Sequence, residues 1–163
     1  MLRTLVIGYG NLDRCDDGVA YCVINSLRAR LGQPALTEDD SGLEALGAPI
    51  DAVFLTQLGA ELVDLVANYD QIVFVDAHVY SQAPDLYCKG VEPEWTQHGF
   101  THHMTPQVLL ALLQRLSDRA PAGHIVSIRG HDFSLGRQLS PATGALVDAA
   151  VQQVLLLACP PAA

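Results

Sequence analysis

A nearly unbroken apolar segment begins close to the start of the chain: RTLVIGYGN, residues 3–11. Its centre contains Val6 and Ile7, and such a short β-branched run is typical of a strand covered on both faces of a parallel sheet. Glycines at positions 8 and 10 end the apolar pattern. The segment therefore predicts a buried strand followed by a tight turn.

A helical pattern follows this turn. Between Asp17 and Leu31 the apolar residues recur at spacings of one, three and four, which places them on one face of a helix. Arg28 and Arg30 fall in its last turn, where positive charge interacts favourably with the helix dipole. A strand followed by a helix is the first half of a β–α–β unit.

The rest of the chain repeats this alternation. We expect further strands at residues 51–55, 71–75, 85–91 and 124–128, and helices at 61–66, 106–116 and 141–157. Thr105 and Ser140 each precede a proline, the favoured arrangement at a helix start. The pattern predicts an α/β fold, a three-layer sandwich with helices on both faces of a mainly parallel, twisted, five-stranded sheet. Because no repeat or linker divides the sequence, we expect a single domain over residues 1–163.

Composition and charge exclude several classes of protein. The 163 residues contain 9 Lys and Arg against 18 Asp and Glu, a net charge of −9, which argues against nucleic acid as a partner. The longest unbroken apolar runs, 108–113 and 154–159, are far shorter than the roughly 20 residues that cross a bilayer. Together with a start that leads directly into a predicted strand, this favours a cytoplasmic protein that binds no membrane. The four cysteines form no C-x-x-C pair, so no zinc knuckle is predicted.

Aspartates stand after two of the predicted strands, where open α/β sheets gather their ligands. Asp16 and Asp17 follow the first strand, and Asp76 comes directly after four apolar residues, where burying a carboxylate without a partner is unfavourable. Asp16 and Asp17 also fit a simpler interpretation, in which Asp16 caps the next helix and Asp17 lies in its first turn. Asp13 stands where a dinucleotide fingerprint requires glycine, so no nucleotide site is predicted.

Two adjacent histidines, His102 and His103, precede the helix expected after Thr105. Two carboxylates and an imidazole form a hard-to-borderline ligand set that suits a divalent transition ion, because nickel and zinc accept imidazole whereas magnesium rarely does. The sequence thus favours a transition-metal site. A solvated or structural role remains the default interpretation for the other histidines: His78, His98, His124 and His131.

Four motifs, in this order, resemble those of the hydrogenase maturation endopeptidases, which trim the C-terminus of the large subunit of nickel–iron hydrogenases. Gly8-x-Gly10-Asn11 followed by Asp16-Asp17-Gly18 is similar to the N-terminal signature of that family. The others are Val75-Asp76-Ala77, Thr101-His102, and Gly130-His-Asp-Phe133 with Gly136 and Leu139-Ser140-Pro141. The resemblance extends over nearly the whole chain.

The resemblance implies a peptidase that removes the C-terminal extension of a nickel-loaded hydrogenase large-subunit precursor. It also implies that Asp17, Asp76 and one of the two histidines bind nickel, that the precursor supplies this nickel, and that no organic cofactor is needed. The apolar face of the next helix begins at the family's spacing when counted from His102, which favours His102 over His103. Hydrolysis could then use the metal, or a carboxylate general base, Asp17 or Asp16.

Two segments depart from the family pattern. Thr56-Gln-Leu-Gly59 stands where many members carry an acidic turn, so no role of that acid transfers to this chain. Asp13-Arg-Cys15 replaces the more apolar residues often found before the aspartate pair, which alters the mouth of the expected cleft without touching Asp17, Asp76 or His102.

Two other function classes fit the sequence less well. A receiver-type signalling domain also places carboxylates after its first and third strands to bind magnesium, but it ends its fifth strand with a lysine. Here that region reads Ile128-Arg129-Gly130, and the only lysine is Lys89. A non-catalytic chaperone on the same scaffold would bind the precursor without cutting it, and retention of the aspartates and the histidine argues against it. Neither an H-E-x-x-H helix nor a G-x-S-x-G elbow is present, so a zincin or a serine hydrolase is not predicted.

Overall fold

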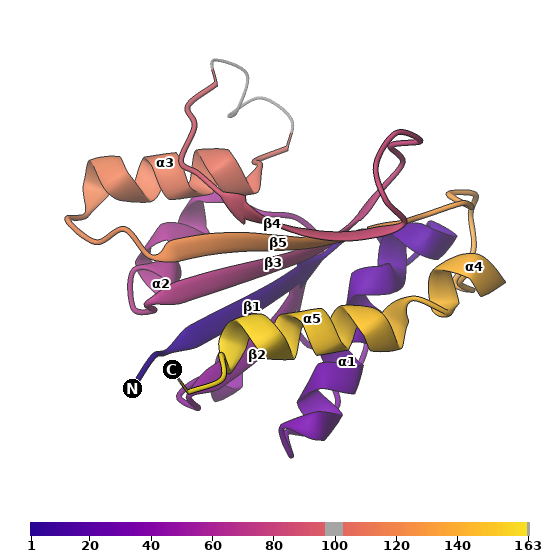
Figure 1. Cartoon of the computed structure of the whole chain (residues 1–163), viewed down its shortest axis with the longest axis horizontal. Helices are drawn as coiled ribbons and strands as arrows, with labels where there is room; N and C mark the ends of the chain where they lie inside the picture. Colours follow the sequence, from indigo (N-terminus) through magenta and orange to yellow (C-terminus); the bar gives the residue numbers. More distant parts are fainter. Residues whose placement is uncertain (97–102, 163) are drawn as a thin grey trace.

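The computed structural model describes residues 1–96 and 103–162 and contains one five-stranded sheet (Figure 1). The strand order is β2-β1-β3-β5-β4. Four strands run parallel to one another: β1 (Thr4–Tyr9), β2 (Ile50–Leu55), β3 (Gln71–His78) and β5 (Ala122–Arg129). The edge strand β4 (Leu86–Val91) is antiparallel to β5. The expected mainly parallel sheet is confirmed.

Helices cover both faces of this sheet, as expected (Figure 1). One face carries α1 (Val19–Arg30), the short α4 (Pro141–Gly144) and α5 (Val147–Ala158), and the other carries α2 (Val63–Val66) and α3 (Pro106–Leu116). The described residues also form three 3-10 turns: η1 (Cys15–Gly18), η2 (Leu43–Ala45) and η3 (Ala60–Leu62). The three-layer α/β sandwich predicted from the sequence is therefore confirmed.

The sheet separates two apolar clusters, which explains why β1 is apolar at successive positions. Val6 packs with α1 and α5 on one face, whereas Leu5 and Ile7 pack with α2 and α3 on the other. Successive side chains of a strand point to opposite faces, so a strand covered on both faces must be apolar throughout. The polar residues of β1, Thr4 and Tyr9, are consequently found at its two ends.

Strand β3 is longer than the sequence pattern indicated. The strand was expected to end at Val75, but it continues to His78 because β5 pairs with it as far as Arg129. Asp76 therefore lies inside the ladder, directly opposite Ser127, and does not follow the strand. This places its carboxylate between two neighbouring strands.

The helix starts agree with the capping signals. The side chains of Thr105 and Ser140 accept hydrogen bonds from the backbone amides of Val108 and Thr143. The last predicted helix is divided in two, since α4 ends at Gly144 and α5 begins at Val147.

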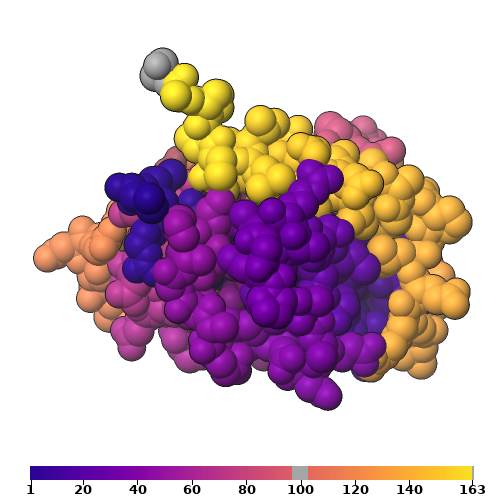
Figure 2. All heavy atoms as spheres, turned by 90° about the horizontal axis from the view of Figure 1, so that it is seen from below, coloured from indigo at the N-terminus to yellow at the C-terminus, as the bar shows by residue number. Residues whose placement is uncertain are grey.

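The stretch Pro141–Ala158 is long and apolar enough to cross a membrane by length and composition alone. The sequence expectation had counted only unbroken apolar runs, and this stretch is interrupted by polar residues. In the structure α5 lies beside α1 (Figure 2) and buries Ala150, Val151 and Val154 completely in the cluster on that face. One face of α5 is therefore part of the apolar cluster on that side of the sheet.

Candidate functional site

A cavity of about 640 Å³ lies at the carboxyl ends of β1, β2 and β3. The cavity lies where the strand order changes direction, between β1 and β3. Doubly wound sheets bind their ligands at this position. Asp17, Asp76 and His103 all line it. Its other lining residues are Tyr9, Gly10, Asn11, Arg14, Thr56, Gln57, Leu58, Ala77 and Met104. Two predicted carboxylates and one predicted histidine thus border the same cavity.

Asp17 is held by the turn that follows β1. The backbone amide of Asn11 donates a 2.8 Å hydrogen bond to Oδ2 of Asp17, and the side chain of Asn11 accepts from the amide of Asp13. A Cβ atom on Gly10 would lie 2.0 Å from the backbone oxygen of Asp17. The Gly-x-Gly-Asn motif therefore lets the turn approach the backbone of Asp17 closely enough to hold its carboxylate.

Asp76 accepts hydrogen bonds from both neighbouring strands. The Tyr9 hydroxyl on β1 donates a 2.9 Å hydrogen bond to Oδ2, and the Ser127 hydroxyl on β5 donates a 2.8 Å hydrogen bond to Oδ1. Burial raises the pKa of Asp76 above its usual range, the two hydrogen bonds oppose that shift, and the charge of Asp17 raises the pKa further. Two carboxylates that repel each other across one cavity form a place where a cation is stabilised.

The hydrogen bonds to Asp76 continue inward to a histidine. Nδ1 of His78 lies 2.9 Å from the Ser127 hydroxyl. Both side chains are buried, Ser127 being 1% and His78 5% exposed. The sequence pattern predicts only a structural role for His78 and no site role for Tyr9 or Ser127. The available signals were a tyrosine between two glycines and a single hydroxyl inside the apolar fifth strand.

The histidine of the predicted site is only partly described. His103 is exposed and lines the cavity, whereas His102, the ligand favoured from the sequence, lies outside the described residues. Within residues 1–96 and 103–162, no three His, Cys, Asp or Glu side chains lie close enough together to hold a metal ion. The two carboxylates fit a transition ion in donor chemistry, and the imidazole that would complete the set stays a prediction.

Asp16 does not belong to this cavity. It is 0% exposed, and its carboxylate accepts hydrogen bonds from the loop and helix start that follow β5. The donors are the amides of His131 (2.7 Å), Asp132 (2.9 Å) and Ser140 (2.7 Å) and the hydroxyls of Ser140 (2.7 Å) and Thr143 (2.9 Å). Burial alone would raise the pKa of Asp16, but these hydrogen bonds lower it to about 2.

These contacts bear on both sequence interpretations of Asp16. Its side chain makes no capping hydrogen bond to α1, so the predicted N-cap is wrong. Both of its oxygens are occupied by donors from residues 131–143, so its suggested role as general base has no support. Asp16 instead ties that segment to the start of α1.

A second cavity, of about 190 Å³, lies on the other side of Asp76. It shares Tyr9, Asp76 and Ala77 with the larger cavity and is walled by Tyr80 and Tyr87. Asp76 thus lines both cavities.

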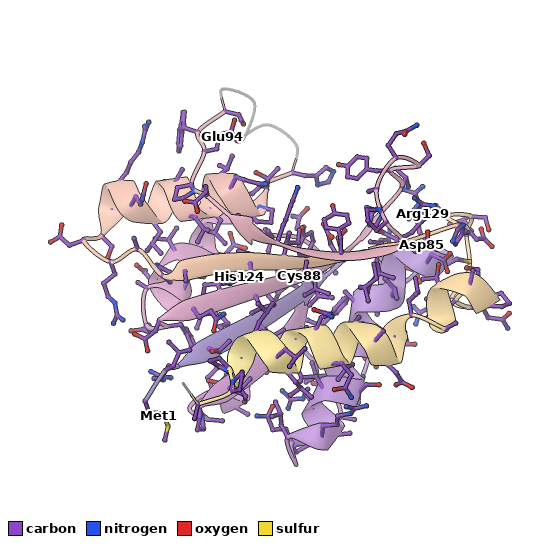
Figure 3. All side chains as sticks on the ribbon, in the orientation of Figure 1. Met1, Asp85, Cys88, Glu94, His124 and Arg129 are labelled. Carbon is purple, nitrogen blue, oxygen red and sulfur yellow. The ribbon has the colours of Figure 1, made fainter. Side chains whose placement is uncertain are left out.

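Arg129, at the position where a receiver domain carries lysine, has a structural role. Its guanidinium pairs with Asp85 at 2.9 Å (Figure 3). It also donates to the carbonyl oxygens of Tyr80, Ser81 and Ala83. It fastens the loop between β3 and β4 to the end of β5. The strand order 2-1-3-5-4, with an antiparallel β4 at the edge, also differs from the order 2-1-3-4-5 of receiver domains. The receiver-domain alternative is therefore not supported.

No protein-family model and no curated protein matches the sequence. Several solved structures are similar to it. The hydrogenase maturating endopeptidase HybD from E. coli has 20% identity and a TM-score of 0.68, with 96% of this chain and 91% of that chain covered. The [NiFe] hydrogenase maturation protease HybD from Thermococcus kodakarensis has 20% identity and a TM-score of 0.68, with 96% of this chain and 99% of that chain covered. The [NiFe] hydrogenase maturation protease HycI from T. kodakarensis KOD1 has 17% identity and a TM-score of 0.62, with 96% of this chain and 90% of that chain covered.

These similarities extend over nearly the full length of each chain. At such low identity they concern the fold, which is that of the [NiFe] hydrogenase maturation proteases. The family resemblance seen in the sequence motifs is thereby confirmed at the level of the fold.

Proposed function

We propose that this protein is an endopeptidase that removes the C-terminal extension of a nickel-loaded [NiFe]-hydrogenase large-subunit precursor. The observation that carries the proposal is the shared cavity of Asp17 and Asp76 at the switch point of the sheet. The fold of the hydrogenase maturation proteases and the position of His103 in the cavity lining give it further support.

In this proposal Asp17, Asp76 and one imidazole of the His102–His103 pair bind the nickel that the precursor presents. The nickel is part of the substrate, and no organic cofactor takes part. When bound, it would polarise the scissile carbonyl or acidify a water molecule. The carboxylates supply two negative charges to the ion, which also relieves the repulsion between them.

Peptide hydrolysis adds water across the C–N bond, and the chain must move one proton. Asp17 borders the cavity whereas Asp16 is buried elsewhere, so we assign acceptance of the water proton to Asp17. The proton then passes to the departing amine nitrogen as the bond breaks. Asp76, which lines both cavities, binds the metal beside the bond that is cleaved.

The part of the cavity lining formed by Thr56 and Gln57 contains no acidic residue, although many hydrogenase maturation endopeptidases have one there. Its uncharged side chains face the same cavity as Asp17 and Asp76. The proposed chemistry therefore rests on the two aspartates and the histidine pair alone.

The experiment is to incubate the protein with nickel-loaded and with nickel-free precursor and to measure the precursor's mass. We expect a loss of mass only with the nickel-loaded form, abolished by Asp17→Asn and by Asp76→Asn. Asp148→Asn, which removes an exposed charge from the first turn of α5, is the matched control and should cleave normally.

Cleavage that does not depend on nickel, or that survives both cavity substitutions in folded variants, would contradict the proposal. Stable binding of the precursor with no change in its mass would support the chaperone alternative instead.

A further inference from the structure

We infer that Tyr9, Ser127 and His78 are positioning residues for Asp76, which fix its carboxylate in the orientation that binds the nickel of the precursor. The inference rests on the proposed function and deepens it, because it names the residues that prepare one of the proposed ligands.

The register of the sheet brings the three side chains to Asp76. Ser127 on β5 lies directly opposite Asp76, so the two side chains share a face of the sheet. On the other side Gly8 lies opposite Val75, so Tyr9 is the next position along and reaches Asp76 from β1. Asp76 is thus held between two strands that are themselves fixed in the sheet.

Hydrogen-bond donors can be assigned along this chain of contacts. The Ser127 hydroxyl has a single proton, which it gives to Oδ1 of Asp76. Its 2.9 Å contact with Nδ1 of His78 must then be donated by the imidazole, so His78 carries its proton on Nδ1. The order of donation is His78 to Ser127 to Asp76.

The carboxylate consequently receives one hydrogen bond on each oxygen, from Tyr9 on Oδ2 and from Ser127 on Oδ1. Each oxygen of an ionised carboxylate has about two lone-pair sites. One site on each oxygen is therefore used to fix its orientation, and the remaining site is free for the cation at the cavity.

The histidine at the far end of the chain is itself held in place. The Tyr80 ring stacks on the His78 ring at 5.7 Å, and the Tyr87 ring lies against it at 4.9 Å. An imidazole in contact with two aromatic rings cannot turn away from Ser127 without disturbing these contacts. The orientation of Asp76 thus depends on contacts that reach the loop between β3 and β4.

The test measures nickel binding by calorimetry, with nickel chloride added to the whole chain. Residues that orient metal ligands through hydrogen bonds contribute about 10- to 100-fold to metal affinity. We expect Ser127→Ala and Tyr9→Phe each to weaken nickel binding about tenfold or more. Asp76→Asn should abolish it.

Two matched controls lie at the opposite end of the same sheet. Tyr69 is also a buried tyrosine whose hydroxyl donates to a strand aspartate, Asp51, at 2.8 Å. Thr4 is a buried hydroxyl that donates to Gln71 at 3.2 Å. Tyr69→Phe and Thr4→Val remove equivalent hydrogen bonds away from the cavity, so they should leave nickel affinity unchanged even where they lower stability.

A second measurement does not depend on metal at all. Nitrogen-15 chemical shifts of His78 in the metal-free protein report which ring nitrogen carries the proton. We expect Nδ1–H in the wild type, and a shift toward Nε2–H in Ser127→Ala because the acceptor of the Nδ1 proton is gone.

The outcomes separate this inference from the proposed function. Nickel binding that Asp76→Asn abolishes but that Ser127→Ala and Tyr9→Phe leave unchanged would overturn the positioning inference alone, as would an Nε2–H tautomer of His78 in the wild type. A wild-type protein that binds no nickel, or that binds it equally well as Asp76→Asn, would overturn the proposed function and this inference with it.

Discussion

Asp16 and Asp17 are neighbours in the sequence, but their carboxylates lie in different environments. Asp17 borders the large cavity and accepts a hydrogen bond from the amide of Asn11. Asp16 is buried, and its carboxylate accepts its hydrogen bonds from residues 131–143. One residue of the pair belongs to the candidate site, and the other joins two distant segments that surround it.

Replacing the buried carboxylate should destabilise the fold. In Asp16→Asn the amide nitrogen of the new side chain would face backbone N–H donors, so at least one hydrogen bond is replaced by a repulsive contact. We expect the free energy of unfolding in urea to fall by about 2–4 kcal/mol, because several charge-assisted hydrogen bonds are involved. Asp17→Asn, with its partly exposed side chain, should change stability by less than about 1 kcal/mol. Equal effects of the two substitutions would contradict this division of roles.

The stability that Asp16 contributes should depend on pH. Its pKa is lowered from 3.8 to about 2 in the folded protein, so the folded state holds the ionised form more strongly than the unfolded state does. The contribution is therefore complete above pH 3.8 and is lost as the pH falls toward 2. Urea unfolding of the wild type and of Asp16→Asn should differ most above pH 4 and should converge as the pH approaches 2. A difference that stays constant over this range would be inconsistent with the lowered pKa.

Asp76 should have the opposite effect on stability. Burial and the charge of Asp17 raise its pKa, so the ionised carboxylate is less stable in the folded protein than in the unfolded chain. Stability is then lost as the pH rises through the raised pKa. We expect Asp76→Asn to be more stable than the wild type at neutral pH and to lose this advantage in acid, as measured by urea unfolding without metal. Asp51→Asn is the comparison, because Asp51 is buried with Tyr69 and backbone donors, and its replacement should destabilise.

Gly10 should tolerate no side chain. A Cβ atom there would lie 2.0 Å from the backbone oxygen of Asp17, and the φ of +155° is one that other residues rarely adopt. Gly10→Ala should displace the turn that holds Asp17, lowering both the melting temperature and nickel affinity. Gly90→Ala on β4 is the control, since the nearest atom to its Cβ would be 4.0 Å away. Similar behaviour of the two variants would show that the approach at Gly10 is not needed.

The layers of the fold were predictable because they depend on short-range patterns. The two-sided burial of β1 makes it apolar at every central position, and Thr105-Pro106 and Ser140-Pro141 mark helix starts by local chemistry. The extent of β3 was not predictable, because its last residues pair with a strand that lies about 50 residues later. Propensity ends the strand at Val75, but pairing with β5 extends it.

The site was predictable in part for the same reason. Asp17 and Asp76 stand at strand ends in the sequence, and such ends meet at one edge of a parallel sheet. Asp16 gives the same local signal as Asp17, and its partners lie 115 to 127 residues away in the chain. The signals at Tyr9 and Ser127 were too weak to place them in a site, because their role follows from the register of three strands.

The most direct measurement of the central claim is a crystal of the whole protein soaked with nickel or cadmium. We predict one ion between the carboxylates of Asp17 and Asp76, within about 2.0–2.5 Å of an oxygen of each. An imidazole nitrogen from His102 or His103 should complete the set and will show which histidine is the ligand. An ion bound elsewhere, with Asp17 and Asp76 facing apart and sharing no metal, would contradict the account.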